Sequence, residues 1–257
     1  MVNIFCNLIL PLKGKKYNSL LEFFLNICYN IFMGYHIDTG LIYEKFKTDC
    51  ECPLCEIQKI VEEQFLHEFL NDAVMEDNTR IKVGKEGFCA KHFDMLFARP
   101  NKLSVALQIS TRVDNLMKII DDKKNVGAAI KQANALIESS KTCAICDFVE
   151  DSMVKYYKTI AQMFEREKDF YKILIKSKGF CLNHYAELLK YSRSAGFMAK
   201  EYVSILGGVE KRNMERVQQD LKRFCDKHDY RNALEPLGNA ETALPRMREK
   251  IYGKKID

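Results

Sequence analysis

The sequence predicts an all-α protein built by tandem duplication of one helical unit. The 257 residues include 5 prolines and 12 glycines, so the chain has few helix-breaking positions. No stretch has the period-two alternation of apolar and polar residues that is typical of a half-buried strand. Two cysteine motifs also recur at nearly constant distance. The C-x-x-C units Cys52–Cys55 and Cys143–Cys146 are 91 residues apart, and the G-F-C-x-x-H units Gly87–His92 and Gly179–His184 are 92 apart.

The first repeat is predicted to span residues 34–121. Apolar residues at helical spacing indicate a helix over 55–74, and the polar stretch 71–86 is expected to contain a loop. A second helix is expected to begin near Phe88 and to end before Pro100, because the residue before proline disfavours the α conformation. A third helix is expected over 102–120.

The second repeat, residues 142–225, follows a connector of residues 122–141 in which a helix is expected over 128–138. Residues 148–175 indicate a long helix that is interrupted, and 180–191 and 197–224 correspond to the second and third helices of the first repeat. The neighbouring glycines Gly207 and Gly208 suggest a kink in the last of these. The tail 226–257 is expected to be irregular, because prolines and glycines punctuate it.

Residues 1–32 form an atypical N-terminal extension, rich in Asn, Phe, Ile and Leu. Three interpretations are open. Met33 is the true start and the extension is not translated, or residues 1–32 contain a real helix, or they form an export signal or membrane anchor. The apolar run 20–32 is short for a membrane span and lacks a small-residue cleavage site, so we favour Met33 as the start.

Composition and charge limit the classes of partner that we expect this protein to bind. Apolar residues make up 47% and charged residues 29%, the balance of a soluble globular protein. The net charge of +5 is too small to indicate nucleic-acid binding, although residues 211–257 carry 12 basic and 8 acidic side chains. Nucleic acid is therefore not favoured as a partner, and a membrane is not favoured unless residues 1–32 are an anchor. A protein partner remains open.

The repeated motifs predict two metal centres. Zinc is bound tetrahedrally by Cys and His, and Cys₃His is one of its usual structural ligand sets. Each repeat supplies one such set, so we expect one ion in each half to join the C-x-x-C and C-x-x-H units of that half. Four protein ligands leave no open coordination position, which favours two structural zinc ions in a cytoplasmic protein. The predicted sets are Cys52, Cys55, Cys89 and His92 in the first half and Cys143, Cys146, Cys181 and His184 in the second.

Other uses of these cysteines stay open at this point. They could be buried core residues, reversible disulfides of the C-x-x-C pairs, or ligands of an iron–sulfur cluster. A c-type haem is excluded because Glu56 and Asp147 stand where C-x-x-C-H needs histidine. Cys50 is a possible alternate ligand, and the isolated Cys6, Cys28 and Cys225 are expected to be ordinary apolar residues.

A resemblance to a known family covers residues 34 to 257. The motifs Cys52–Cys55 and Gly87–His92, together with Tyr35–Thr39 and the tail segments Asp229–Asn232 and Ala243–Arg246, resemble an uncharacterised bacterial family catalogued as domain of unknown function 6062. The resemblance implies no activity, and the metal sites are inferred from spacing alone.

These observations favour a protein without catalytic activity. No P-loop, dinucleotide-binding, nucleophile-elbow or H-E-x-x-H motif is present. The first hypothesis is a zinc-stabilised helical protein that binds a partner or acts as an adapter. The alternative is a thiol-based redox or metal-responsive switch that uses the C-x-x-C pairs. A weaker third option is nucleic-acid binding through the basic tail.

Overall fold

The computed structural model describes residues 37, 39–71, 75–122, 125–227 and 236–254. Within these residues the fold is all-α, as predicted, and contains no strand. The elements are α3 (Thr39–Lys47), α4 (Pro53–Leu70), α5 (Asp77–Glu86), α6 (Ala90–Phe97), α7 (Lys102–Met117), α8 (Val126–Ser140), α9 (Ala144–Arg166), α10 (Lys168–Lys176), α11 (Leu182–Lys190), η3 (Ser192–Met198), α12 (Ala199–Asp226), η5 (Gly238–Thr242) and α13 (Ala243–Tyr252).

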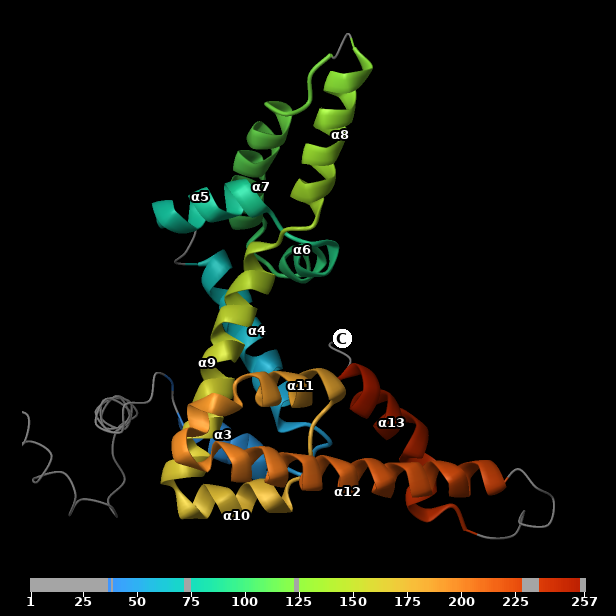
Figure 1. Ribbon diagram of the computed structural model, residues 1–257. Helices are drawn as coiled ribbons and strands as arrows, with labels where there is room; N and C mark the ends of the chain where they lie inside the picture. Colours follow the sequence, from blue (N-terminus) through green and yellow to red (C-terminus); the bar gives the residue numbers. More distant parts are fainter. Residues whose placement is uncertain (1–36, 38, 72–74, 123–124, 228–235, 255–257) are drawn as a thin grey trace, which may run out of the picture.

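Two long helices, α4 and α9, form the axis of the molecule. They lie side by side and run in opposite directions (Figure 1). Helices α5 to α8 gather at the end where α4 stops and α9 starts, whereas α3 and α10 to α13 gather at the other end. Each axial helix therefore begins among helices of the opposite repeat, and the two halves interlock.

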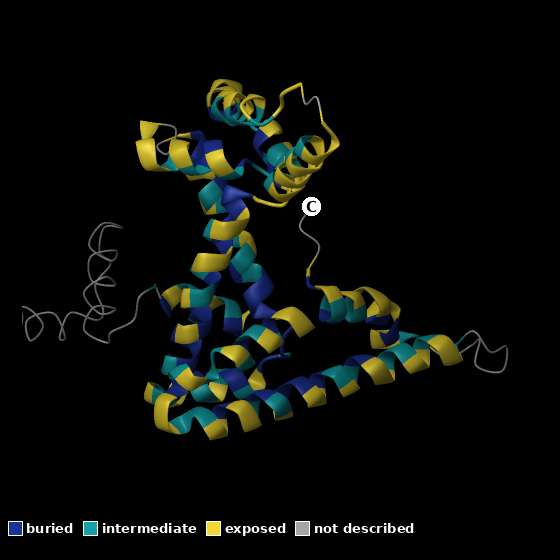
Figure 2. Ribbon diagram, turned by 45° about the horizontal axis from the view of Figure 1, so that its top comes forward, coloured by how far each residue is buried: buried dark blue, intermediate teal, exposed yellow. Residues whose placement is uncertain are grey.

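Aromatic side chains hold the axial helices together. The rings of Phe65 and Phe69 on α4 lie 5.4 and 5.6 Å from the ring of Phe148 on α9, measured between centroids. At the other end of α9, the ring of Phe164 lies 5.0 Å from the fully buried ring of Tyr202 on α12. Aromatic pairs at these distances add to the free energy of apolar burial. Figure 2 shows the buried residues concentrated along this axis and at its two ends.

The helix bounds follow most of the sequence-based expectations. The expected interruption of the long helix falls at Glu167, whose extended backbone separates α9 from α10. The connector holds α8, which begins at an Asn125 side chain that accepts a hydrogen bond from the backbone N–H of Ala128, an ordinary N-cap. The expected kink at Gly207 is absent, because α12 continues through it as one helix.

The expectation of an irregular tail is wrong for residues 238–252. This segment forms η5 and the helix α13. Pro245 does not break α13 because it is the third residue of that helix, where backbone N–H groups have no partner within the helix. The predictions for residues 1–32, for Met33 and for Asp229–Asn232 concern positions outside the described residues.

In the described part of the chain, no helix combines the length and the apolar character needed to cross a membrane.

Candidate metal centres

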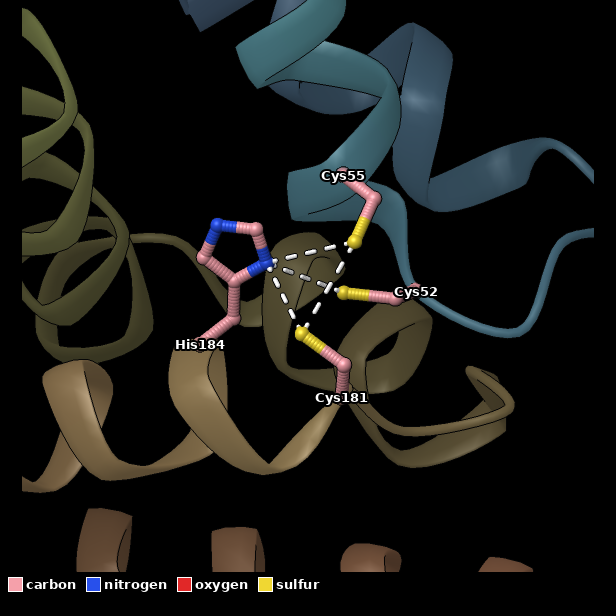
Figure 3. Close-up of side chains that lie close together, drawn as sticks. All are labelled: Cys52, Cys55, Cys181 and His184. Carbon is pink, nitrogen blue, oxygen red and sulfur yellow. Dashed lines mark hydrogen bonds between the residues drawn. The ribbon is translucent and has the colours of Figure 1, made fainter. Parts of the chain in front are cut away.

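Four predicted ligands meet where α4 and α11 begin. We call this cluster site A; it contains Cys52, Cys55, Cys181 and His184, all buried. The Nδ1 atom of His184 lies 3.4 Å from the sulfurs of Cys52 and Cys55 and 3.2 Å from that of Cys181. The sulfurs of Cys55 and Cys181 are 3.7 Å apart. Figure 3 shows the three sulfurs and the histidine nitrogen pointing toward one common centre.

The other four ligands meet where α6 and α9 begin. We call this cluster site B; it contains Cys89, His92, Cys143 and Cys146. The Nδ1 atom of His92 lies 3.3, 3.2 and 3.3 Å from the sulfurs of Cys89, Cys143 and Cys146. The sulfurs of Cys89 and Cys146 are 3.9 Å apart. The two sites thus have the same composition and nearly the same geometry.

These distances fit a tetrahedral ion of the size of zinc. With Zn–S bonds of about 2.3 Å and Zn–N bonds of about 2.0–2.1 Å, a tetrahedron separates sulfur from nitrogen by roughly 3.6 Å and two sulfurs by roughly 3.8 Å. A disulfide requires about 2.05 Å between sulfurs, and all eight described cysteines are free thiols. Both clusters therefore have the spacing of a metal-binding site.

The structure corrects the predicted pairing of the motifs. The expectation was that the C-x-x-C and C-x-x-H units of one half share an ion. Instead, Cys52 and Cys55 meet Cys181 and His184 of the second half, and the remaining four residues meet likewise across the halves. The physical reason is length. Helices α4 and α9 have 18 and 23 residues, whereas the following α5 and α10 have 10 and 9. At 1.5 Å per residue, α4 and α9 carry the chain farther than α5 and α10 can bring it back. The C-x-x-H unit of each half therefore stays away from the C-x-x-C unit of the same half.

The backbone conformation explains why each G-F-C-x-x-H unit begins with glycine. Gly87 and Gly179 have φ angles of +70° and +79°, in the left-handed region that disfavours other residues. At Gly179 an added Cβ would also lie 2.7 Å from a carboxylate oxygen of Glu210. This turn places the following cysteine at the N-terminus of the next helix, where the helix dipole favours a thiolate.

Site A is enclosed by the C-terminal helices. Lys250 on α13 is fully buried, and its ammonium donates hydrogen bonds to the backbone carbonyls of Glu51, Lys178 and Phe180 at 3.0, 2.5 and 3.1 Å. Burial lowers the pKa of Lys250, and the carboxylates of Glu210 and Glu51 act against that shift. Just beyond α13, the backbone N–H of Lys254 donates to the sulfur of Cys55 at 3.4 Å. The tail therefore joins both ligand-bearing segments of site A.

Replacing Lys250 by methionine is expected to destabilise the protein by about 3–5 kcal/mol, because it leaves the buried carboxylate of Glu210 without its cation and three backbone carbonyls without a donor. Thermal unfolding followed by circular dichroism measures the change. The matched control is Lys254→Met, which removes a partly exposed pair with Glu56 and should cost no more than about 1 kcal/mol. Equal melting temperatures for the two variants would contradict this role of Lys250.

Site B has a buried carboxylate behind its histidine. The Nε2–H of His92 donates to Glu62 on α4 at 2.7 Å, and the Lys91 ammonium donates to the same oxygen at 2.5 Å. Burial acts to raise the pKa of Glu62, but these two hydrogen bonds outweigh it and lower that pKa. A carboxylate on the far ring nitrogen fixes the tautomer and orientation of a metal-ligating histidine. At the equivalent position of the second repeat stands Met153, so site A lacks this carboxylate.

The Glu62→Gln variant is expected to bind zinc at site B roughly 10–100-fold more weakly, because the amide orients His92 less strongly than the carboxylate does. Competition with a chromophoric chelator measures the two affinities separately. Site A should retain its wild-type affinity. Glu63→Gln is the control, since Glu63 is a partly exposed neighbour paired with Arg99 and belongs to neither site. An unchanged affinity at site B in Glu62→Gln would show that the carboxylate plays no part in binding.

The two sites differ in exposure. All four ligands of site A are buried, whereas Cys146 of site B is exposed and Cys89 is half-buried. Burial raises the pKa of Cys52 well above its ordinary value. Burial also acts to raise the pKa of Cys143, but hydrogen bonds from His92 and from backbone N–H groups lower it to about 6. Site B is therefore the more accessible of the two to solvent and to reagents.

A cavity of about 490 Å³ lies between the two sites. Ligands of both sites line it, among them Cys55 and His184 of site A and Cys146 of site B. Charged side chains, including Glu150, share its wall with apolar ones such as Tyr157. Its volume is within the range of small-molecule binding pockets.

The remaining cysteines lie outside both clusters. Cys50 belongs to neither site, so the described geometry does not use it as an alternate ligand, and Cys225 is exposed on α12. Cys6 and Cys28 fall outside the described residues. Sequence reasoning missed Glu62 and Lys250. One signal for Glu62 exists in the repeat alignment, which sets a carboxylate against a methionine at equivalent positions.

Comparison with known proteins gives a family without an assigned function. No curated protein and no solved structure matches the chain significantly. One family model matches, described as a family of unknown function, DUF6062, and the match covers residues 33–257. It contains all eight ligands of sites A and B. The chain therefore belongs to the DUF6062 family, as the motifs and the tail suggested.

Proposed function

We propose that this protein is a zinc-stabilised helical binding or adapter protein that acts in the cytoplasm. The observation that carries the proposal is the exchange of motifs between the halves. Each site joins the start of an axial helix from one repeat to the start of a helix from the other. Two ions would therefore fasten both ends of the α4–α9 pair and hold the interlocked halves together.

Zinc is favoured among metals by the chemistry of the donors. Three thiolates and one imidazole at tetrahedral spacing suit zinc, whereas iron–sulfur clusters are usually held by cysteines alone. Four protein ligands complete the tetrahedron and leave no open position for a substrate, which supports a structural role. The cavity between the sites supports binding of a ligand or partner, since it is formed by residues of both halves.

Native mass spectrometry of protein purified without added metal tests the metal assignment. We expect two zinc ions per chain, and loss of helical circular dichroism when a strong chelator removes them, because the binding free energy of a structural zinc is also folding free energy. Protein that is folded with free thiols and no bound metal would overturn the proposal. Iron or another metal in place of zinc would overturn the zinc assignment.

The exposure of site B favours the second candidate function, a thiol-based or metal-responsive switch. Cys146 is exposed and lies 3.9 Å from Cys89, so an oxidant has access to two neighbouring sulfurs. Two thiolates would give up one electron each to hydrogen peroxide, form a disulfide, and release the zinc ion, while peroxide and two protons become two waters. Site A offers no such access.

Mild peroxide treatment distinguishes the two functions. The switch requires release of one zinc ion per chain with loss of two thiols, and recovery of both on reduction. An adapter with two structural ions should retain both zinc ions and all thiols that ligate them. The Cys225→Ala variant is the control, since Cys225 is exposed but belongs to neither site, and its loss should not change the release of zinc.

A further inference from the structure

Helix α8 presents its more apolar face to solvent. None of its 15 residues is buried, and Figure 2 shows it without the colour of buried residues. Val126, Ile130 and Ile137 expose 76%, 56% and 53% of their surface. With the exposed Ala133 they form a stripe, which we call the α8 stripe. Its spacing of four, three and four residues is the pattern of a seam between two packed helices.

The α8 stripe is not turned toward α7, the other arm of the hairpin. The partly buried residues of α8 are Ala128, Gln132, Leu136 and Ser139, and Arg112 of α7 donates a 2.8 Å hydrogen bond to the carbonyl of Ser139. Since successive helical residues turn by about 100°, the α8 stripe lies roughly 130° around the helix from this inner face. A helix of this length is marginal in water without a packed apolar face. A partner for the stripe is therefore missing from the single chain as described.

Helix α7, which makes little direct contact with α8, also exposes apolar side chains. Val113 and Met117 on α7 expose 46% and 60% of their surface. Counted at about 100° per residue, they lie on the same side of the antiparallel hairpin as the α8 stripe. The hairpin projects away from the rest of the molecule (Figure 1), so that side is open to a second body.

We propose that the α7–α8 hairpin is a dimerisation surface, and that its occupant is the same hairpin of a second copy of this chain. The α8 stripe is symmetric about its midpoint between Lys131 and Gln132. In an antiparallel pair of α8 helices, Val126 of one copy therefore meets Ile137 of the other, and Ile130 meets Ala133. A two-fold axis needs such a self-complementary surface.

Charge and size agree with a second copy as the occupant. Lys131 and Glu138 are turned roughly 110–130° from the middle of the stripe, so no like charges face one another across the seam. The positions beside the seam include Gly127 and Ala129, whose small side chains permit close approach of two helices. A standard interface buries about 800 Å² of surface on each partner. A face made of two helices can supply more of this area than a single helix can. This inference goes beyond the proposed function, because neither metal site takes part in it.

Sedimentation equilibrium of the full chain tests the proposal. We expect a mass twice the 29.9 kDa of one chain at about 50 µM protein, since dimerisation follows mass action. In the Ile130→Asp variant the dimer should dissociate at least about 100-fold more readily, because the carboxylate would be buried without a partner. Ile130 is exposed in the single chain and belongs to neither site A nor site B, so the metal content should not change. Lys131→Asp is the control and should remain dimeric.

A pair of substitutions tests the antiparallel register. Val126→Lys and Ile137→Glu should each weaken the dimer, whereas the variant that carries both should dimerise again, since the new cation of one copy meets the new carboxylate of the other. A parallel pair would set like charges together and give no rescue. A monomeric wild-type chain would overturn the proposal and leave the face to a different protein. A dimer that survives Ile130→Asp would also overturn it, because the contact would then lie elsewhere.

Discussion

The Cys181→Ala variant is expected to lose one zinc ion and, with it, most of the stability of the fold. Site A joins the starts of α4 and α11, and the tail packs against it through Lys254. Structural zinc contributes about 10–16 kcal/mol of apparent binding free energy in small zinc-binding peptides, against a net stability of about 5–15 kcal/mol for a whole protein. Loss of this ion therefore exceeds what the helical core can offset.

Native mass spectrometry and thermal unfolding together check this expectation. Cys225→Ala is the matched control, because Cys225 is an exposed cysteine outside both clusters. The control should bind two zinc ions and melt as the wild type does. A Cys181→Ala variant that still binds two ions, or that melts within a few degrees of the control, would show that site A is not a structural zinc site.

The second large effect is expected from Cys146→Ala, and it is local. This substitution removes a ligand from site B, which contains α6, while α11 belongs to site A. Hydrogen exchange of the α6 amides, residues 90–97, should become faster by a factor of about 100 or more, as expected for opening of one cooperative unit. Amides of α11, residues 182–190, should be protected as in the wild type.

This experiment also decides how the motifs are paired. If each half held its own ion, Cys146 would share that ion with Cys181 and His184, and Cys146→Ala would loosen α11 instead of α6. The Cys225→Ala variant is the control, since Cys225 lies outside both clusters, and it should leave α6 and α11 protected as in the wild type. Faster exchange of α11 in Cys146→Ala would be incompatible with the arrangement described for sites A and B.

Local patterns predicted the helices because helix formation depends on near neighbours in the chain. The apolar spacing over 102–120 corresponds to α7, and the interruption expected within 148–175 is Glu167. The errors arose where a residue was interpreted without its position in an element. Pro245 indicated an irregular tail, yet it falls in the first turn of α13, where proline is tolerated. Gly207 indicated a kink, but α12 continues through it.

The sequence by itself determined the helical class, the duplication and the identity of the eight residues that form sites A and B. These depend on residue type and on spacing within a few positions, which one chain displays directly. The tertiary structure decided which motifs meet. Because the repeated motifs are identical in type, pairing within halves and pairing between halves satisfy the sequence equally well. The antiparallel packing of α4 and α9 settles the choice, since it brings the start of each long helix to the C-x-x-H unit of the other repeat. The same packing buries Glu62 behind His92 and leaves site B the more exposed site; both features depend on contacts between segments far apart in the chain.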